Sequence, residues 1–304
     1  MDYALTTHAL CKQYGSFQAL DGLTMRVPKG AIYGFVGKNG VGKTTLIRLV
    51  CGLQRPSAGE FFISGVRHTD SAIAEARKKL GAVVESPSMF PDLSAEENLR
   101  YQYRLLGLPD EDGIPELLQL VGLEQLGKKQ AKDFSLGMRQ RLGLAIALCG
   151  KRDFLILDEP INGLDPQGIL DFRELIQHLN RERGITFLIS SHILDELARL
   201  ATHYGFIDRG RTVRELSARE LEDACRKSIR VRVTDTAALP PVLDGMGLSY
   251  QITDRTGAEI YGRPEISALV FALAERNCRL LSCTEQEESL ESFFFSLVGG
   301  GDRA

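Results

Sequence analysis

The sequence lacks any long apolar run. No stretch of about 18 consecutive apolar residues occurs, which argues against a membrane-spanning helix. The first residues, Met1 to Ala4, have neither the basic residues nor the long apolar stretch of a secretion signal, so we expect no signal peptide. If the protein helps to move a molecule across a membrane, another subunit must supply the path.

Cysteine and histidine are few and are not spaced for metal binding. The chain has 6 cysteines and 5 histidines, no C-x-x-C pair and no histidine in zinc-like spacing to a cysteine. We therefore expect that the protein binds no zinc and that its thiols are reduced, as in a cytosolic protein. The alternative is a disulfide between Cys278 and Cys283.

An excess of positive charge is also missing. The net charge is -3 over 304 residues, which gives no general reason to expect nucleic-acid binding, although local basic patches stay open. With 43% hydrophobic and 25% charged residues, the composition is that of a globular protein. The length suits one large domain followed by a small one.

Residues 1–216 alternate short apolar strands with helical stretches. The predicted strands are apolar on both faces, as in a sheet covered by helices on both sides, and cover residues 31–36, 81–84, 154–157 and 185–189. Ser94 to Glu97 forms a capping box, and Asp165-Pro166 is an N-cap followed by proline at the first helical position. The pattern predicts an α/β doubly wound domain.

Residues 217–304 have a different pattern and are predicted to form a small α+β domain. Residues 229–233 alternate with period two, and two further strand candidates flank a turn-like cluster at 254–257. Helices are expected at 236–246, 265–276 and 289–297, and another strand at 279–282. The order β-α-β-β-α-β is that of a split βαβ, ferredoxin-like unit.

A phosphate-binding loop follows the apolar strand predicted at residues 31–36. Residues 37–44 match G-x-x-x-x-G-K-[ST] between a predicted strand and a predicted helix, which is the context that the motif requires. The glycines let backbone N–H groups face the phosphates of a nucleotide, Lys43 would pair with the β- and γ-phosphates, and Thr44 would bind Mg²⁺. The expected nucleotide-binding residues here are Gly37, Lys38, Asn39, Gly40, Val41, Gly42, Lys43, Thr44 and Thr45. The loop by itself indicates only a nucleoside triphosphate.

Two acids end the apolar strand at 154–157. Asp158 at the strand tip could hold Mg²⁺, and Glu159 could polarise an attacking water. Taken alone, such a pair could equally be a solvated strand end. Its position downstream of the phosphate-binding loop favours the catalytic interpretation.

Four further segments make the sequence resemble the ABC ATPases. Residues 134–141, Phe-Ser-Leu-Gly-Met-Arg-Gln-Arg, are similar to the family's signature motif, residues 162–165 to its D-loop, His192 to its switch histidine and Tyr14 to its adenine-stacking aromatic. The resemblance covers residues 1 to about 216, with every motif in order. It implies a P-loop cassette with a mixed sheet and a helical signature subdomain, which binds ATP and Mg²⁺ and hydrolyses ATP.

The resemblance gives each of these residues an expected task. Tyr14 would offer its ring to adenine, and His192 would contact the γ-phosphate and orient the water. Ser135 and Gly137 begin a helix, so their N–H groups can bind an anion, and the resemblance implies the γ-phosphate of ATP on the opposite subunit. Asp165 of the D-loop joins the nucleotide-binding set. A chain with one phosphate-binding loop and one signature motif then needs a head-to-tail homodimer to complete its sites, with ATP favouring the closed dimer.

Two departures from the family pattern narrow the prediction. Glu85 stands where the family usually has glutamine, and a carboxylate is also a ligand for Mg²⁺. Leu136 and Met138 replace a glycine and a glutamine of the signature, but the backbone donors remain, so we expect an active ATPase. With the sequence around it, Glu85 makes the chain resemble the bacitracin-resistance and lantibiotic-immunity exporters.

This resemblance implies an ATPase subunit that drives the export of antimicrobial peptides. It would lie on the cytoplasmic face of the cell membrane, held there by separate permease subunits. A soluble ABC ATPase acting on ribosomes or DNA is the alternative, but such relatives usually carry two cassettes or a long coiled-coil insertion. A regulatory module without turnover is a third hypothesis, supported only by Glu85, Leu136 and Met138.

Overall fold

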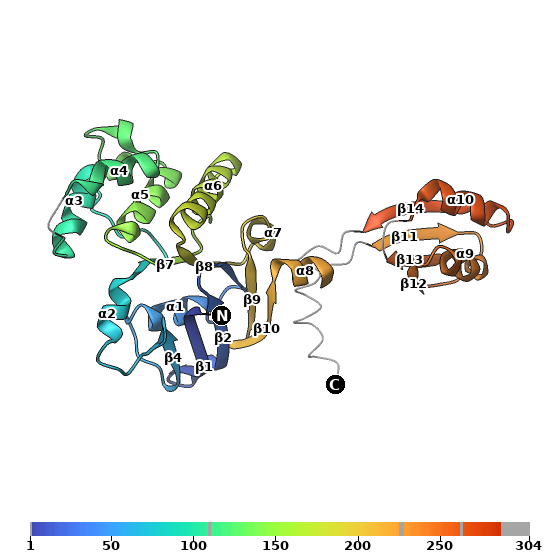
Figure 1. Cartoon of the computed structure of the whole chain (residues 1–304), viewed down its shortest axis with the longest axis horizontal. Coiled ribbons are helices and arrows are strands. Elements are labelled where there is room, and N and C mark those ends of the chain that lie inside the picture. The colour runs from blue at the N-terminus through green and yellow to red at the C-terminus, as the bar shows by residue number, and fades with distance from the viewer. Residues whose placement is uncertain (1, 109–110, 225–227, 262–263, 287–304) are drawn as a thin grey trace. The chain divides into compact units, whose positions relative to one another are not determined.

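The structure is a computed structural model that describes residues 2–108, 111–224, 228–261 and 264–286. The chain divides into two compact units, Met1–Ala218 and Arg219–Ala304 (Figure 1). Within the described ranges, no helix has both the length and the apolar character needed to cross a membrane.

A six-stranded sheet forms the centre of the first unit. Its order is β10-β9-β3-β8-β7-β6, and all neighbours are parallel except the edge strand β10 (Arg211–Ser217). The parallel strands are β3 (Ile32–Val36), β6 (Leu80–Val83), β7 (Phe154–Asp158), β8 (Thr186–Ser191) and β9 (His203–Asp208). Every residue of β3, β7 and β8 is buried, which explains their apolar composition on both faces. The four strands predicted from the sequence are confirmed.

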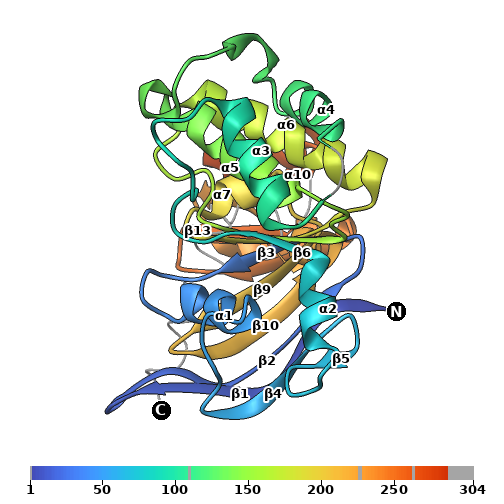
Figure 2. The ribbon, with the colours of Figure 1, turned by 90° about the vertical axis from the view of Figure 1, so that its left-hand side faces the viewer.

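A second, antiparallel sheet encloses the helix that follows the phosphate-binding loop. Its order is β2-β1-β4-β5, from β1 (Tyr3–Tyr14), β2 (Phe17–Pro28), β4 (Ala58–Ile63) and β5 (Val66–Arg67). Helix α1 (Lys43–Val50) lies between the two sheets (Figure 2). Its apolar residues are fully buried in a cluster to which both sheets contribute. The start of α1 is therefore held in a fixed position.

Four helices cover the other face of the central sheet. Figure 2 shows α3 (Ala95–Leu105), α4 (Gly113–Leu120), α5 (Leu136–Leu148) and α6 (Pro166–Arg183) gathered there. The unit also contains α2 (Ile73–Lys78) and α7 (Leu194–Ala198). The mixed sheet with a separate group of helices is the cassette fold that the sequence predicted.

The predicted helix caps are present. The Ser94 side chain accepts from the Glu97 N–H while the Glu97 carboxylate accepts from the Ser94 N–H, so α3 begins with a complete capping box. Asp165 caps α6 by accepting from the Gly168 N–H at 3.1 Å, and Pro166 follows at the first helical position. Local sequence thus fixes where these two helices start.

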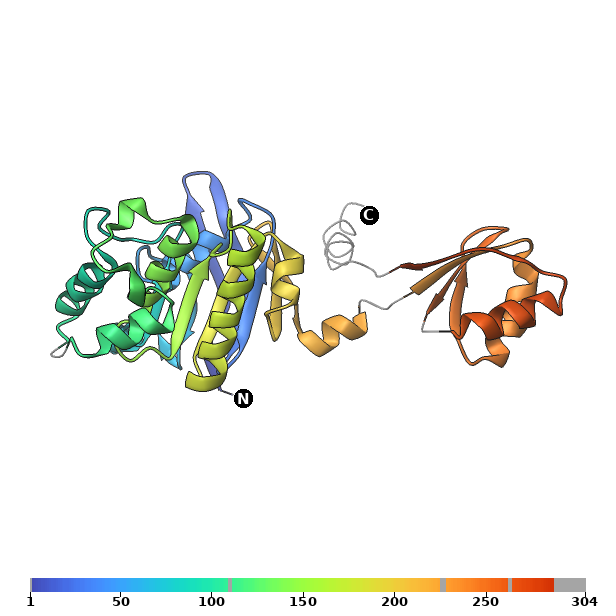
Figure 3. The same cartoon turned by 90° about the horizontal axis from the view of Figure 1, so that it is seen from above.

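The second unit is a four-stranded antiparallel sheet with two helices on one face (Figure 3). The chain order is β11 (Ser228–Val233), α9 (Leu239–Gly245), β12 (Ser249–Ile252), β13 (Gly257–Tyr261), α10 (Ile266–Ala274) and β14 (Leu280–Gln286), and the sheet order is β12-β13-β11-β14. Leucines of both helices pack on Ile229, Val231 and Val233 in one core. The predicted split βαβ arrangement is confirmed. A further helix, α8 (Ala218–Ala224), precedes it.

Two expectations for this region have different outcomes. Cys278 and Cys283 are both free, so the alternative of a disulfide between them is wrong. The buried Cys278 thiol donates to the Asp235 carbonyl at 3.2 Å instead. The helix expected at residues 289–297 lies outside the described residues.

Close packing of α5 provides a test of the first unit. A Cβ on Gly143 would lie 2.5 Å from Pro87 Cβ, so the sequence has glycine where α5 meets the segment after β6. We predict that Gly143→Ala lowers the stability of the first unit by about 1–3 kcal/mol, because the helix or the segment must move. Calorimetric unfolding would measure the loss.

A second helical glycine gives the matched control. Gly245, the last residue of α9, would place a new Cβ in open space, so Gly245→Ala should not destabilise the second unit. Equal unfolding temperatures for Gly143→Ala and the unaltered protein would contradict the prediction.

Candidate functional site

The phosphate-binding loop connects β3 to α1 and is shaped by close backbone contacts. Gly42 caps α1 with φ 112°, in the left-handed region that favours glycine. A Cβ on Gly42 would lie 2.5 Å from the Ala19 carbonyl oxygen, so no other residue fits there without movement. Gly37 is buried, whereas Lys38, Asn39 and Gly40 are exposed. The strand, loop and helix required by the motif are all present.

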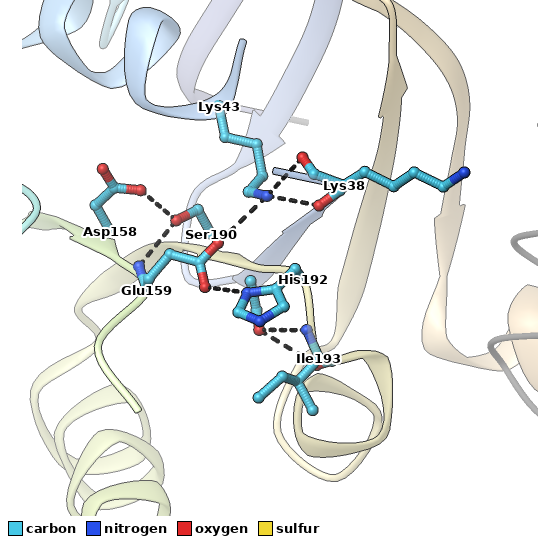
Figure 4. Close-up of polar contacts among 9 residues, drawn as sticks. Lys38, Lys43, Asp158, Glu159, Ser190, His192 and Ile193 are labelled. Carbon is cyan, nitrogen blue, oxygen red and sulfur yellow. Dashed lines mark hydrogen bonds and ion pairs between the residues drawn. The ribbon is translucent and has the colours of Figure 1, made fainter. Parts of the chain in front are cut away.

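Lys43 carries a buried positive charge at the centre of this loop. Its side chain is only 5% exposed, and Nζ donates to the Gly37 carbonyl at 2.5 Å and to the Lys38 carbonyl at 3.1 Å. Nζ also lies 3.3 Å from Glu159 Oε1 (Figure 4). A buried ammonium needs such partners, because it has lost the water that would otherwise solvate it. The loop therefore holds the Lys43 ammonium directly beside the Glu159 carboxylate.

Glu159 joins Lys43 to His192. The Glu159 backbone, directly after β7, is in the left-handed region at φ 51°, and its N–H points to Ser190 Oγ at 2.9 Å. His192 Nδ1 donates to Glu159 Oε2 at 2.5 Å. This geometry brings together the predicted base and the predicted switch histidine, with the carboxylate between two nitrogen groups (Figure 4).

Asp158 points to the opposite side of the same strand end, where it has one unused oxygen. Ser190 Oγ donates to Asp158 Oδ1 at 2.5 Å, while Oδ2 is buried and has no hydrogen-bond partner in the structure. Buried carboxylate oxygens are rarely left unpaired, and an unpaired one at a strand end suits a hydrated cation. The donor set thus fits Mg²⁺. Among the described residues, no cluster of three or more His, Cys, Asp or Glu could hold a metal by itself, so phosphate oxygens would have to complete the coordination.

The other loop residues lie around this centre. Thr44 and Thr45 are half-buried in the first turn of α1, and Val41 accepts at its carbonyl from the Gly210 N–H at 3.0 Å. Thr44 is next to Lys43 in sequence and carries a hydroxyl at the helix start. It is available as a ligand.

Tyr14 is the last residue of β1, at the hairpin between β1 and β2. It is 39% exposed, its hydroxyl donates to Gln54 Oε1, and Lys12 Nζ lies 5.1 Å from the ring centre. An aromatic ring with an accessible surface can stack on a base. The position is compatible with the predicted adenine contact.

Ser135, Gly137 and Asp165 form a separate group. Ser135 is the exposed N-cap of α5, where its Oγ accepts from the Met138 N–H at 3.3 Å. Leu136 lies against the D-loop, since a Cβ on Gly163 would be 3.1 Å from Leu136 Cδ2. Within the described part of the chain, no hydrogen bond or ion pair joins this group to Lys43, Asp158 or Glu159.

Glu85 is paired with a residue that the sequence did not suggest. Its carboxylate accepts from the guanidinium of Arg48 on α1. Glu85, which the sequence predicted as a metal ligand, is thus paired with the Arg48 guanidinium in this structure.

Sequence reasoning missed three residues that hold the site. Ser190 links Asp158 to Glu159, Arg48 binds Glu85, and Gln54 binds Tyr14. Ser190 could have been found as a polar residue at the end of a buried strand, two positions before His192. No comparable signal marks Arg48 or Gln54, whose partners are 37 and 40 positions away.

The cassette also matches known proteins. The family model described as "ABC transporter" matches residues 20–162. The bacitracin transport ATP-binding protein BcrA of Bacillus licheniformis is 38% identical over 99% of this chain and 99% of its own. The lantibiotic transport ATP-binding protein SrtF of Streptococcus pyogenes is 40% identical over 68% of this chain and 87% of its own.

A solved structure agrees with the fold of the first unit. The cbiO1 protein of Clostridium perfringens, described as part of the ABC transporter complex cbiONQ, aligns with a TM-score of 0.65 and 27% identity. The alignment covers 73% of this chain and 92% of that one.

Lys43 provides the most direct test of the site. Replacing Lys43 by alanine should weaken ATP binding at least about 30-fold, or about 2 kcal/mol, because a buried cation at the phosphates is lost. Isothermal titration with ATP and Mg²⁺ would measure the affinity.

The neighbouring lysine is the control. The Lys38 side chain points away from Glu159 (Figure 4), so Lys38→Ala should change the ATP affinity far less. Similar losses for both variants would show that general charge, rather than the Lys43 position, determines binding.

Proposed function

Because the chain belongs to the ABC transporter ATP-binding proteins, we propose that it is the ATP-hydrolysing motor of a peptide-antibiotic exporter. The motor would work as a homodimer that closes around two ATP molecules. The observation that carries the hydrolytic part is the contact of Glu159 with both Lys43 and His192. Full-length similarity to BcrA supports the exporter part.

ATP binding would exchange the partners of Lys43. Without phosphates its ammonium is bound by two loop carbonyls and Glu159. A triphosphate in the loop offers stronger acceptors to the same ammonium, and the N–H groups at the start of α1 add to the attraction. Glu159 then loses one of its two partners and becomes available to a water molecule.

Glu159 would act as the general base. Its carboxylate accepts the proton of the water that attacks the γ-phosphorus, while the bond to the leaving β-phosphate oxygen breaks. His192 Nδ1 keeps the carboxylate oriented through the 2.5 Å hydrogen bond. The Glu159 backbone N–H is bound to Ser190 of β8, so the side chain can change its partners while the backbone stays in place.

Thr44, Asp158 and Glu85 are the residues that would hold Mg²⁺. The unpartnered, buried Oδ2 of Asp158 supports this assignment most strongly. When bound, the cation neutralises charge on the phosphate oxygens during the reaction.

Dimerisation would complete the site. The start of α5 would form an anion-binding surface. It consists of the exposed N-cap Ser135 and the N–H groups of the first helical turn, which includes Gly137. Among the described residues, no carboxylate is bound there. In a head-to-tail dimer this surface would receive the γ-phosphate of the ATP bound to the opposite subunit, with Asp165 nearby. Because each ATP would then contact both subunits, hydrolysis would loosen the dimer.

Separate permease subunits would hold the dimer at the cytoplasmic face of the membrane and contain the export path. BcrA resembles this chain over both units, whereas the alignment with SrtF covers 68% of it. The second unit, proposed here as residues 217–304, would then be an accessory domain of the bacitracin-type motor.

Glu159→Gln tests the hydrolytic step. The amide cannot take up the proton, so turnover should fall at least about 100-fold. The substitution also removes the ion pair between position 159 and Lys43. Lys43 then has no competing carboxylate and binds the phosphates, so ATP should remain bound. We predict an ATP-dependent dimer in size-exclusion chromatography.

A second variant tests whether that dimer uses the signature surface. Adding Ser135→Arg to Glu159→Gln should abolish the dimer, since the bulky side chain blocks the anion-binding end of α5. Unchanged turnover in Glu159→Gln would remove Glu159 as the base, and a dimer that persists with arginine at 135 would contradict the proposed interface.

Export is tested in cells. Expressed with its permease in a sensitive bacterium, the chain should raise the inhibitory concentration of bacitracin or a lantibiotic several-fold. The same permease with Glu159→Gln should not. Co-purification with ribosomes, with no protection and no permease, would favour the soluble alternative.

A further inference from the structure

Glu85 has a backbone conformation that few residues adopt. Its φ is 61°, and the Ser86 N–H donates to the Val84 carbonyl at 2.7 Å, which closes a three-residue turn centred on Glu85. A turn of this kind with positive φ is rare and strained for any residue with a side chain. Because such a conformation persists only when neighbouring contacts hold it, the contacts of Glu85 indicate its role.

Arg48 makes the contact on one side. Its guanidinium donates to Glu85 Oε1, and it lies four residues after Thr44 on α1. Residues four apart lie on the same face of a helix, about 6 Å apart along its axis. The helix face that carries Thr44 therefore carries, one turn later, the cation that binds the Glu85 carboxylate.

Pro87 makes the contact on the other side. A Cβ on Gly143 of α5 would lie 2.5 Å from Pro87 Cβ and 2.9 Å from its Cγ, so the proline packs directly on that helix. The segment from Glu85 to Pro87 thus connects α1, which begins at the phosphate-binding loop, to α5, which begins after Ser135.

The Arg48–Glu85 pair is suited to being broken and remade. The Arg48 side chain is 36% exposed and that of Glu85 59%, so water screens the pair and its contribution to stability is small. A glutamine at this position could still accept a hydrogen bond from Arg48, but it would lack the opposite charge that makes the contact an ion pair.

We propose that Arg48 is a positioning residue that holds the Glu85 carboxylate one helical turn away from Thr44. This proposal rests on the proposed function, in which Glu85 belongs to the Mg²⁺ site. Glu85 has two positions: paired with Arg48, with the strained turn closed, or directed to the cation site. Release from Arg48 frees the turn and changes the link between α1 and α5.

Hydrogen exchange in the nucleotide-free protein tests the pair without any metal. In Arg48→Gln the turn loses its side-chain anchor, so amide exchange over residues 84–90 should rise by about twofold to fivefold. Arg48→Lys keeps the charge and should stay close to the unaltered protein. The matched control is Arg67→Gln, which breaks the similarly exposed Arg67–Glu60 pair between β5 and β4 and should leave residues 84–90 unchanged.

Manganese affinity tests the competition. With ADP bound, Mn²⁺ binding followed by electron paramagnetic resonance should become about twofold to fivefold tighter in Arg48→Gln, because Glu85 no longer has to leave Arg48. The double variant Arg48→Gln/Glu85→Gln should bind Mn²⁺ like Glu85→Gln alone. A merely structural surface pair would instead give no change in affinity, or equal changes with and without Glu85.

The outcomes separate this inference from the proposed function. Unchanged exchange and unchanged Mn²⁺ affinity in Arg48→Gln overturn the role of Arg48, even if Lys43→Ala and Glu159→Gln behave as expected. If those two variants fail to affect ATP binding and turnover, the proposed function fails, while the exchange experiment still reports on the pair.

Discussion

The buried ammonium of Lys43 is the interaction on which the first unit depends. A cation with 5% exposure is tolerated only when several acceptors surround it, and here they come from the Gly37–Lys38 backbone and from Glu159. These acceptors belong to loops that follow β3 and β7, and His192, which fixes Glu159, follows β8. The three strands are neighbours in the order β3-β8-β7, so their carboxyl ends deliver all three groups to one place. The packing of α1 between two sheets then fixes the backbone of Lys43, which is the first residue of this helix.

Two acids that follow adjacent strands have strained backbones, and polar contacts help to hold each of them. Glu159 and Glu85 have φ angles of 51° and 61° and follow the adjacent strands β7 and β6. Each conformation costs about 1–3 kcal/mol unless its surroundings compensate. Two hydrogen bonds from the Glu159 N–H to Ser190 help to hold one acid. The other is held by the turn hydrogen bond from Ser86 to Val84 and the packing of Pro87 on Gly143, with a small contribution from Arg48. These strained acids are the two whose side chains change partners in the mechanism proposed above.

The sequence predicted the parts of this arrangement that depend on local patterns. Apolar strands, the glycine loop, the Ser94 capping box and the Asp165 cap all follow from residues close together in the chain, and the structure contains each of them. Ser190 carries a local signal, but the contacts of Arg48 and Gln54 could not be predicted, because they join segments 37 and 40 residues apart that only the tertiary fold brings together. The sequence also could not reveal that Glu85 is turned towards a cation of α1, since a carboxylate in that position is an equally good metal ligand by composition alone.

Charge balance explains how the chain can have a glutamate at position 85, where the ABC ATPase pattern predicts glutamine. Asp158 and Glu159 already place two carboxylates at the strand ends, and a third at Glu85 would repel the phosphates of ATP. Arg48 supplies a compensating cation from the same helix that carries Lys43 and Thr44, so that the region keeps the charge it would have with a neutral residue at 85. The Glu85 carboxylate can leave Arg48 without an electrostatic penalty only when another cation neutralises it. If Glu85 changes partners as proposed, its position would follow the state of the phosphate site, and the contact of Pro87 with Gly143 would carry the change to the helix that begins after Ser135.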